Sequence, residues 1–219
     1  MGREIDLMEN YPRTKRDVSA RGAEKTEDDR RIARQFGKDF FDGDRKVGYG
    51  GFNYNARFWQ PVIPTFQKHF GLTANSSVLD AGCAKGFMLY DFTQIIPGIK
   101  VAGIDISAYA IEHGKEEVRP FMQVADIQEM PFPDKSFDVV ISVTTVHNLE
   151  MDGVKRALKE IQRLQRRGSF ITVDAYRDEA EKRRMFDWNL TAKTVLHVDE
   201  WKELFAQVGY TGDYHWFMP

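Results

Sequence analysis

One stretch of the sequence, from Ser77 to Phe87, restricts the fold more than any other. Its apolar first half ends at Asp80, and two closely spaced glycines, Gly82 and Gly86, follow before a helical pattern resumes. This order predicts a buried strand, a tight turn and the start of a helix. The glycines remove side chains where the backbone turns and a ligand approaches, and a helix start offers free N–H groups and the positive end of its dipole. The stretch therefore predicts a nucleotide-cofactor site that suits anionic or carboxylate-bearing ligands.

The details of the turn separate the possible cofactors. A dinucleotide fingerprint needs Gly-x-Gly-x-x-Gly with an acid about 20 residues further on. A P-loop needs Gly-x-x-x-x-Gly-Lys followed by Ser or Thr, and the sequence has no such run, which argues against ATP hydrolysis. The turn here is Gly82-x-Ala84-x-Gly86, preceded by Asp80. It resembles the Asp-x-Gly-x-Gly-x-Gly signature of class I S-adenosylmethionine (SAM) methyltransferases, with Ala84 in place of the middle glycine.

Three further segments follow in the order and spacing that such methyltransferases show. They are residues 101–107, 124–127 and 136–143. The first predicts a buried strand that ends at Asp105, the second a short strand that ends at Asp126, and the third the fourth strand of the sheet. An alternative role for Asp105 is structural, because Ser107 follows it and is a good residue to begin a helix. A Rossmann-like sheet that binds no SAM is the alternative for the whole region.

The resemblance implies a role for each of these positions. Asp105 would accept hydrogen bonds from the ribose hydroxyls, and Asp126 would take the adenine amino group with Ile127 packed on the ring. Asp80 would lie near the methionine ammonium, and the backbone of Ser142 or Val143 would accept from that ammonium. The complete set of expected cofactor-binding residues is Asp80, Gly82, Gly86, Asp105, Ile106, Asp126, Ile127, Ser142, Tyr49 and Arg57.

From Ser77 onward, strand and helix patterns alternate, which predicts an α/β fold: a Rossmann-like, doubly wound, mostly parallel sheet of six or seven strands with helices on both faces. We expect a SAM-binding domain over residues 76–219. The expected helices are 84–95, 108–116, 151–164 and 198–208, and the later strands are 168–174 and 213–217.

Residues 1–75 are expected to form an N-terminal arm and a helical lid. The charged residues 1–30 predict a mobile arm leading into a short helix capped near Thr26. Residues 40–54 are rich in Gly and aromatic side chains and predict a functional loop, which a helix over residues 57–70 would carry across the cofactor cleft. In this lid Tyr49 and Arg57 are candidate contacts, Arg57 for a carboxylate of SAM or of the substrate.

The C-terminus departs from the usual plan of such methyltransferases, which end in an antiparallel hairpin of two strands. Pro219 ends the chain after only one of them, so either the sheet has six strands or residues 191–197 supply the missing one. A short edge can pair with another subunit, and a homodimer is therefore possible.

Composition restricts partners and location. With 31 basic and 33 acidic residues the formal net charge is −2, which disfavours a broad nucleic-acid surface. Cys83 is the only cysteine, so no internal disulfide forms, and a small packing residue is its expected role. We expect no metal site. No apolar run is long enough to span a membrane and the N-terminus is charged, which predicts a cytoplasmic protein with no membrane partner.

Methyl transfer demands little of the protein beyond positioning, exclusion of water and sometimes a general base. Three residues that follow the fourth and fifth strands are candidates for the acceptor side. They are His147, Asp174 and Tyr176. His147 is expected either to accept a proton or to be structural. Asp174 would orient an amine or act as base, and Tyr176 would contact the sulfonium through its ring or instead pack in a loop against Trp188.

Over residues 45–219 the chain looks like the type 11 group of SAM-dependent methyltransferases, some of which serve polysaccharide or secondary-metabolite pathways. This resemblance implies methyl transfer from SAM to an O or N atom of a small molecule, releasing S-adenosylhomocysteine. Three alternatives stay open: an enzyme that cyclises SAM and releases methylthioadenosine, a SAM-binding regulatory module, and a methyltransferase that acts on a macromolecule. The last is disfavoured by the net charge and by the sequence Val143-Thr144-Thr145-Val146, where amino-methylating nucleic-acid enzymes usually carry Asp/Asn-Pro-Pro-Tyr/Phe.

Overall fold

A seven-stranded sheet forms the centre of the computed structural model, which describes residues 2–12, 25–48 and 50–219. The strand order is β3-β2-β1-β4-β5, and both β6 and β7 pair with β5. Every strand pair is parallel. The strands are Ser77–Ala81 (β1), Lys100–Asp105 (β2), Met122–Val124 (β3), Phe137–Val143 (β4), Gln165–Tyr176 (β5), Leu196–His197 (β6) and Asp213–Phe217 (β7). The predicted Rossmann-like fold is confirmed.

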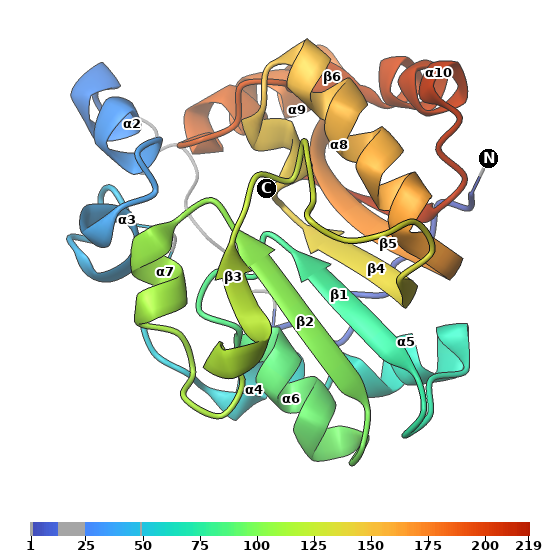
Figure 1. Ribbon diagram of the computed structural model, residues 1–219. Coiled ribbons are helices and arrows are strands. Elements are labelled where there is room, and N and C mark those ends of the chain that lie inside the picture. Colours follow the sequence, from blue (N-terminus) through green and yellow to red (C-terminus); the bar gives the residue numbers. More distant parts are fainter. Residues whose placement is uncertain (1, 13–24, 49) are drawn as a thin grey trace.

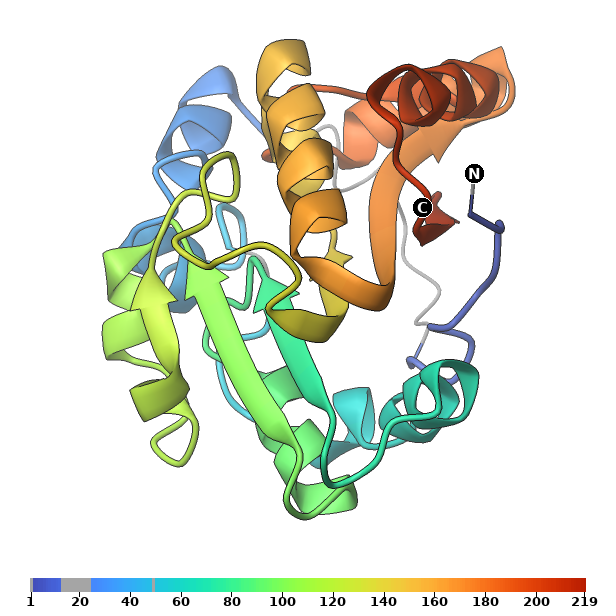
Figure 2. The ribbon, with the colours of Figure 1, turned by 45° about the vertical axis from the view of Figure 1, so that its right-hand side comes forward.

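Helices cover both faces of this sheet (Figures 1 and 2). On one face α5 and α6 bury Phe66 and Phe92 against β1, β4 and β5, and on the other α8 and α10 bury Leu158 and Phe205. The helices are Glu27–Ala33 (α2), Lys38–Asp42 (α3), Ala56–Trp59 (α4), Ile63–Phe70 (α5), Phe87–Ile95 (α6), Ala108–Glu112 (α7), Met151–Leu164 (α8), Glu179–Trp188 (α9) and Val198–Val208 (α10), with 3-10 turns at Arg119–Phe121 (η1) and Val146–Asn148 (η2).

Two expected helices are wrong in their extent. The helix expected over residues 57–70 is instead two helices, α4 and α5, because Pro61 has no N–H to continue the first and Pro64 lies in the first turn of the second. The helix expected over residues 108–116 ends at Glu112. The remaining α/β elements fall close to their predicted positions.

The N-terminal segment is better ordered than its charge suggested. Helix α2 begins after Thr26, whose side chain accepts from the N–H of Asp29, as predicted. The expectation of a mobile arm is wrong for residues 2–12, because Leu7 is buried in the core and Glu4 forms a β-bridge with Tyr214. Apolar contacts and backbone hydrogen bonds together hold this segment in place.

The C-terminal edge confirms one of the two expected arrangements. Residues 196 and 197 supply the missing strand as β6, and β7 runs parallel to β5 instead of closing a hairpin. The outer edge of β7 is occupied by the chain itself: Ile5 N donates to Tyr214 O (2.9 Å) and Tyr214 N to Arg3 O (3.0 Å). This contact removes the reason for expecting a dimer at that position.

Candidate cofactor and acceptor site

The turn after β1 has the backbone shape that its glycines suggested. Gly82 has φ of 95°, and a Cβ there would lie 2.1 Å from Thr145 Oγ1. Gly86 has φ of 72°, and a Cβ there would lie 2.5 Å from Met122 Sδ. Both positions therefore require glycine. Ala84 also lies in the left-handed region, with φ of 48°, which explains why a glycine suits this middle position.

Two acids lie at the carboxyl ends of the neighbouring strands β1 and β2. The carboxylate of Asp105 accepts from the N–H groups of Ala84 and Ser107, both at 2.8 Å. Each of its oxygens keeps a further lone pair for a ligand hydroxyl. Burial raises the pKa of Asp105, and burial together with the charge of Asp105 raises the pKa of Asp80 to about 8. The pair favours a ligand that brings hydrogen-bond donors or positive charge.

Ser107 itself begins the following helix, since its side chain accepts from Ala110 N at 3.0 Å. The helix-capping role that was the alternative for Asp105 is thus carried by Ser107. Asp105 links the turn to the helix start and still presents its carboxylate at the strand end.

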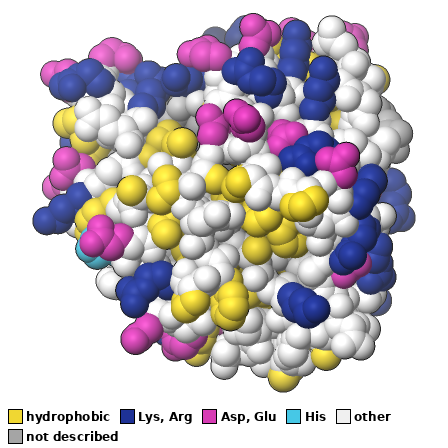
Figure 3. All heavy atoms as spheres, viewed as in Figure 1, with side chains coloured by type: hydrophobic (Ala, Val, Ile, Leu, Met, Phe, Trp, Pro, Cys, Tyr) yellow, Lys and Arg dark blue, Asp and Glu magenta, His cyan; other side chains and the backbone are white. Residues whose placement is uncertain are grey.

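The two isoleucines in the expected cofactor-binding set, Ile106 and Ile127, differ in solvent exposure. Ile106 is 56% exposed directly after Asp105, whereas Ile127 is 7% exposed and belongs to the core. The carboxylate of Asp126 accepts from the backbone N–H of Gln128 at 2.8 Å and from its side chain at 3.1 Å. Figure 3 shows apolar side chains gathered over the middle of the face seen in Figure 1, with charged groups around them. Ile106 is therefore the more accessible of the two isoleucines, and a contact of either one with the adenine ring stays a prediction.

Two more buried residues, Ser142 of the predicted set and Cys83, make packing contacts, and the contact of the Ser142 backbone with the SAM ammonium stays a prediction. Ser142 is buried, and its hydroxyl donates to the carbonyl of Ala81 at 2.7 Å, which ties β4 to β1. Burial raises the pKa of the Cys83 thiol, so this cysteine is an inert packing residue, as expected.

On the acceptor side the structure brings His147 and Asp174 together. His147 Nδ1 accepts from the backbone N–H of Asp174 at 2.9 Å and lies 3.5 Å from its Oδ1. Burial lowers the pKa of His147 to about 3 and raises the pKa of Asp174 to about 7. Because Nδ1 is an acceptor, the ring proton lies on Nε2, so the neutral ring can donate from Nε2 but has no free lone pair for a proton. Asp174 is the member of the pair that titrates near neutral pH.

Tyr176 has contacts other than those expected. Its ring lies 5.7 Å from that of His197, and Lys182 Nζ lies 5.3 Å above it, so one face of the ring already meets a cation. Trp188, the packing partner considered in the alternative, instead lies 6.0 Å from the ring of Phe217.

Of the two lid candidates, the structure describes only Arg57, and it does not bring Arg57 to the strand ends. Arg57 is exposed on α4, which packs against α6, and its guanidinium lies 4.7 Å from the ring of Phe58. Tyr49 lies outside the described residues.

A partly buried ion pair that sequence reasoning missed joins α3 to the turn. Lys85, in the turn between Ala84 and Gly86, donates through Nζ to Asp42 Oδ1 (2.5 Å) and to the carbonyl of Phe52 (2.9 Å). Tyr109 donates to the other oxygen of Asp42 at 2.9 Å. The side chain of Lys85 is only 6% exposed. Helix α3 is thereby fastened to the proposed cofactor turn.

A second set of contacts extends this attachment. Ser107 Oγ donates to the carbonyl of Phe36 at 2.5 Å, and Phe40 and Phe41 form an apolar cluster with Ala110. Figures 1 and 2 place α2 and α3 beyond the carboxyl ends of β1 and β2. Helices α2 and α3, and not the segment around Arg57, are therefore the elements placed to serve as the expected lid.

Within the part of the chain that the structure describes, no three His, Cys, Asp or Glu side chains are grouped so that they could hold a metal ion. In the same residues no helix has the length and apolar character needed to cross a membrane.

Comparisons with known proteins show similarity to methyltransferases. Residues 79–173 match the type 11 family described as a methyltransferase domain. The chain is 32% identical over 144 residues to a demethylmenaquinone methyltransferase of Symbiobacterium thermophilum, covering 62% of this chain and 55% of that protein. It is 29% identical over 143 residues to a tRNA (carboxymethyluridine(34)-5-O)-methyltransferase of Arabidopsis thaliana, covering 64% of this chain and 33% of that protein. The chain thus spans about half or less of these relatives.

A solved structure shows the same fold. The phosphoethanolamine N-methyltransferase 2 of Haemonchus contortus, in complex with SAM, superposes with a TM-score of 0.56 at 18% identity, covering 81% of this chain and 44% of that one.

Proposed function

We propose that this chain, whose residues 79–173 belong to the type 11 methyltransferase domain family, transfers a methyl group from SAM to an O or N atom of a small molecule. The observation that carries the proposal is the left-handed turn from Gly82 to Gly86 beside the paired carboxylates of Asp80 and Asp105. A ribose offers two hydroxyl donors to Asp105, and the SAM ammonium offers positive charge to Asp80. Binding of that cation would return Asp80 to its ionised form.

SAM would supply an activated methyl group, so the chain's own residues need only position the acceptor, exclude water and manage a proton. Asp174, with its pKa near 7, is suited to take the proton of a hydroxyl or amine acceptor. His147 holds the backbone of Asp174 through Nδ1 and presents Nε2–H as a donor. The lid, fastened by Lys85 and Asp42, would cover the cofactor and keep water out.

A small-molecule acceptor is favoured over a nucleic acid by the charge of the chain. Its formal net charge is −2, so a polyanion such as a nucleic acid would gain little binding energy from electrostatic attraction. The cavity beside the lid, about 550 Å³, has the size of small-ligand sites.

The test is to incubate the pure protein with SAM, with and without a panel of hydroxyl and amine acceptors, and to identify the products by mass spectrometry. Formation of S-adenosylhomocysteine together with a methylated acceptor is the expected result. Methylthioadenosine accumulating above the uncatalysed rate with SAM alone would mean that SAM itself is the substrate. Bound but unconverted SAM across a broad panel would favour a regulatory module.

A further inference from the structure

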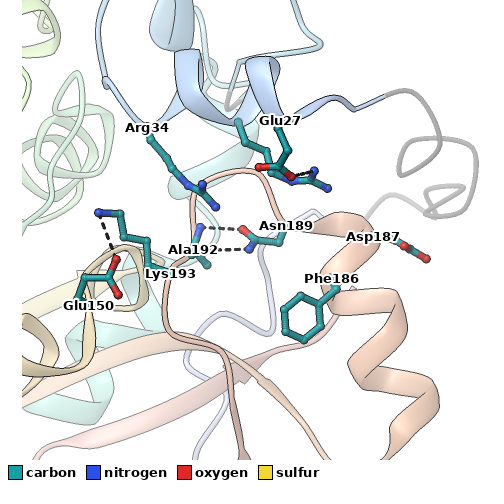
Figure 4. A pocket seen from close by; sticks show the side chains of 9 residues that line it. Glu27, Arg34, Glu150, Phe186, Asp187, Asn189, Ala192 and Lys193 are labelled. Carbon is teal, nitrogen blue, oxygen red and sulfur yellow. Dashed lines mark hydrogen bonds and ion pairs between the residues drawn. The ribbon is translucent and has the colours of Figure 1, made fainter.

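A cavity of about 550 Å³ lies between α2, α9 and the loop that follows α9 (Figure 4). Phe186 of α9, 51% exposed, contributes an apolar wall, and Arg34, directly after α2, extends toward the loop at Ala192. The cavity thus combines a basic side chain with a flat apolar surface.

Among the described charged residues that line this cavity, all but Arg34 and Asp187 form ion pairs, and Figure 4 shows the Asp187 carboxylate turned away from Arg34. Arg30 pairs with Glu27 at 2.6 Å, and Lys193 pairs with Glu150 at 3.6 Å. Arg34 makes no ion pair with any residue that the structure describes, and its Nε is buried without a hydrogen-bond partner. A buried donor without a partner is unfavourable, and a ligand that accepts from it gains that hydrogen bond.

The wall of the cavity is bonded to the candidate catalytic pair. Asn189 closes the loop by donating to the carbonyl of Ala192 and accepting from its N–H, both at 2.7 Å. The N–H of Lys193 then donates to the carbonyl of His147 at 3.0 Å, and His147 in turn accepts from the N–H of Asp174. The cavity wall is therefore connected to the candidate base, Asp174, through two successive hydrogen bonds by way of His147.

We propose that this cavity binds the methyl acceptor, and that the acceptor carries a carboxylate held by Arg34 beside an apolar ring that packs on Phe186. The inference rests on the proposed function and names its substrate class. The planar guanidinium forms two parallel hydrogen bonds with a carboxylate. Arg34 is the one unpaired positive charge among the described lining residues, and with Glu27, Glu150 and Asp187 also in the lining it suits a monoanion better than a phosphate dianion.

The test measures binding of three probes to the protein saturated with S-adenosylhomocysteine: 4-hydroxybenzoate, the uncharged 4-hydroxybenzamide, and phenyl phosphate. Dissociation constants come from protein-observed NMR titrations. The variants are Arg34→Gln and Arg34→Lys, which keeps the charge but loses the planar fork. The matched control is Arg31→Gln, which removes an exposed arginine of α2 that pairs with Asp28. Melting temperature and S-adenosylhomocysteine affinity, by calorimetry, show whether each variant folds.

We expect 4-hydroxybenzoate to bind the wild type roughly tenfold or more tightly than 4-hydroxybenzamide, as a charge-assisted pair implies. Arg34→Gln should remove that preference, Arg34→Lys should weaken it, and Arg31→Gln should keep it. The inference is overturned if 4-hydroxybenzoate shows no binding or no preference while S-adenosylhomocysteine binds, or if Arg31→Gln acts like Arg34→Gln. Tighter binding of phenyl phosphate would overturn the carboxylate assignment. Absence of S-adenosylhomocysteine binding to the wild type would overturn the proposed function as well.

Discussion

Replacing Lys85 with Met should loosen the lid while leaving the sheet intact. Lys85 Nζ donates to Asp42 and to the Phe52 carbonyl, and the two charged side chains are 6% and 27% exposed. Removing one partner of a fully buried pair costs about 3–5 kcal/mol. Asp42 is partly exposed and keeps its hydrogen bond from the hydroxyl of Tyr109. We therefore expect the substitution to weaken the packing of α3 on the turn by about 2 kcal/mol, which changes the equilibrium between packed and detached α3 roughly thirtyfold.

Amide hydrogen exchange measures this effect locally. The N–H groups of Phe40 and Phe41, which donate to Gly37 O, and of Gly43, which donates to Asp39 O, report on α3. Amides within β1 and β4 report on the sheet. In Lys85→Met the α3 amides should exchange roughly thirtyfold faster.

The matched control is Lys182→Met, which removes an exposed ion pair with Glu179 on α9 and should leave the α3 amides unchanged. Unchanged exchange of the α3 amides in Lys85→Met would refute the conclusion that the Lys85–Asp42 ion pair holds α3 in place. An equal acceleration of α3 and β1 amides would show that Lys85 stabilises the whole fold instead of the lid.

Three other perturbations have expected outcomes. The rate constant kcat/KM should rise with pH through about 7, because the base must be ionised and burial raises the pKa of Asp174 to about 7. Asp174→Asn should flatten this pH profile. A wild-type profile that is flat between pH 6 and 8 would exclude Asp174 as the base. Gly82→Ala should lower the free energy of unfolding by about 1–3 kcal/mol more than Gly209→Ala, because Gly209 also has a positive φ but has open space where a Cβ would lie. Equal melting temperatures of the two variants would contradict the steric argument. Tyr54→Phe removes the 2.6 Å hydrogen bond to Asp91, whose other oxygen has no partner, and should cost about 1–3 kcal/mol by thermal denaturation; an unchanged melting curve would contradict this.

The local parts of the site could be predicted from the sequence because neighbouring residues determine them. The turn from Gly82 to Gly86 needs glycine for backbone reasons within a few residues, and Asp105 ends a strand whose apolar pattern is plain. The prediction of one helix over residues 57–70 missed the break at Pro61, although the missing N–H of proline is a property of the residue itself.

Contacts between distant segments could not be predicted in this way. Lys85 and Asp42 are 43 residues apart, and their pairing depends on how α3 docks on the turn. Arg57 is the opposite case, a contact that was expected and is not seen. Its charge does not reveal that α4 packs on α6, where the guanidinium lies beside the ring of Phe58. The tautomer of His147 depends on a backbone N–H 27 residues later in the chain.

Calorimetric titration of SAM into the wild type and into Asp105→Ala tests the central claim most directly. We expect one SAM per chain in the wild type and at least about tenfold weaker binding in the variant, because a charge-assisted contact to the ribose contributes roughly 1.5–3 kcal/mol. The titration is interpretable if both proteins unfold cooperatively, since Asp105 also accepts from the backbone of Ala84 and Ser107. No binding to the wild type, or equal affinity in a folded Asp105→Ala, would contradict the placement of SAM at the carboxyl ends of β1 and β2.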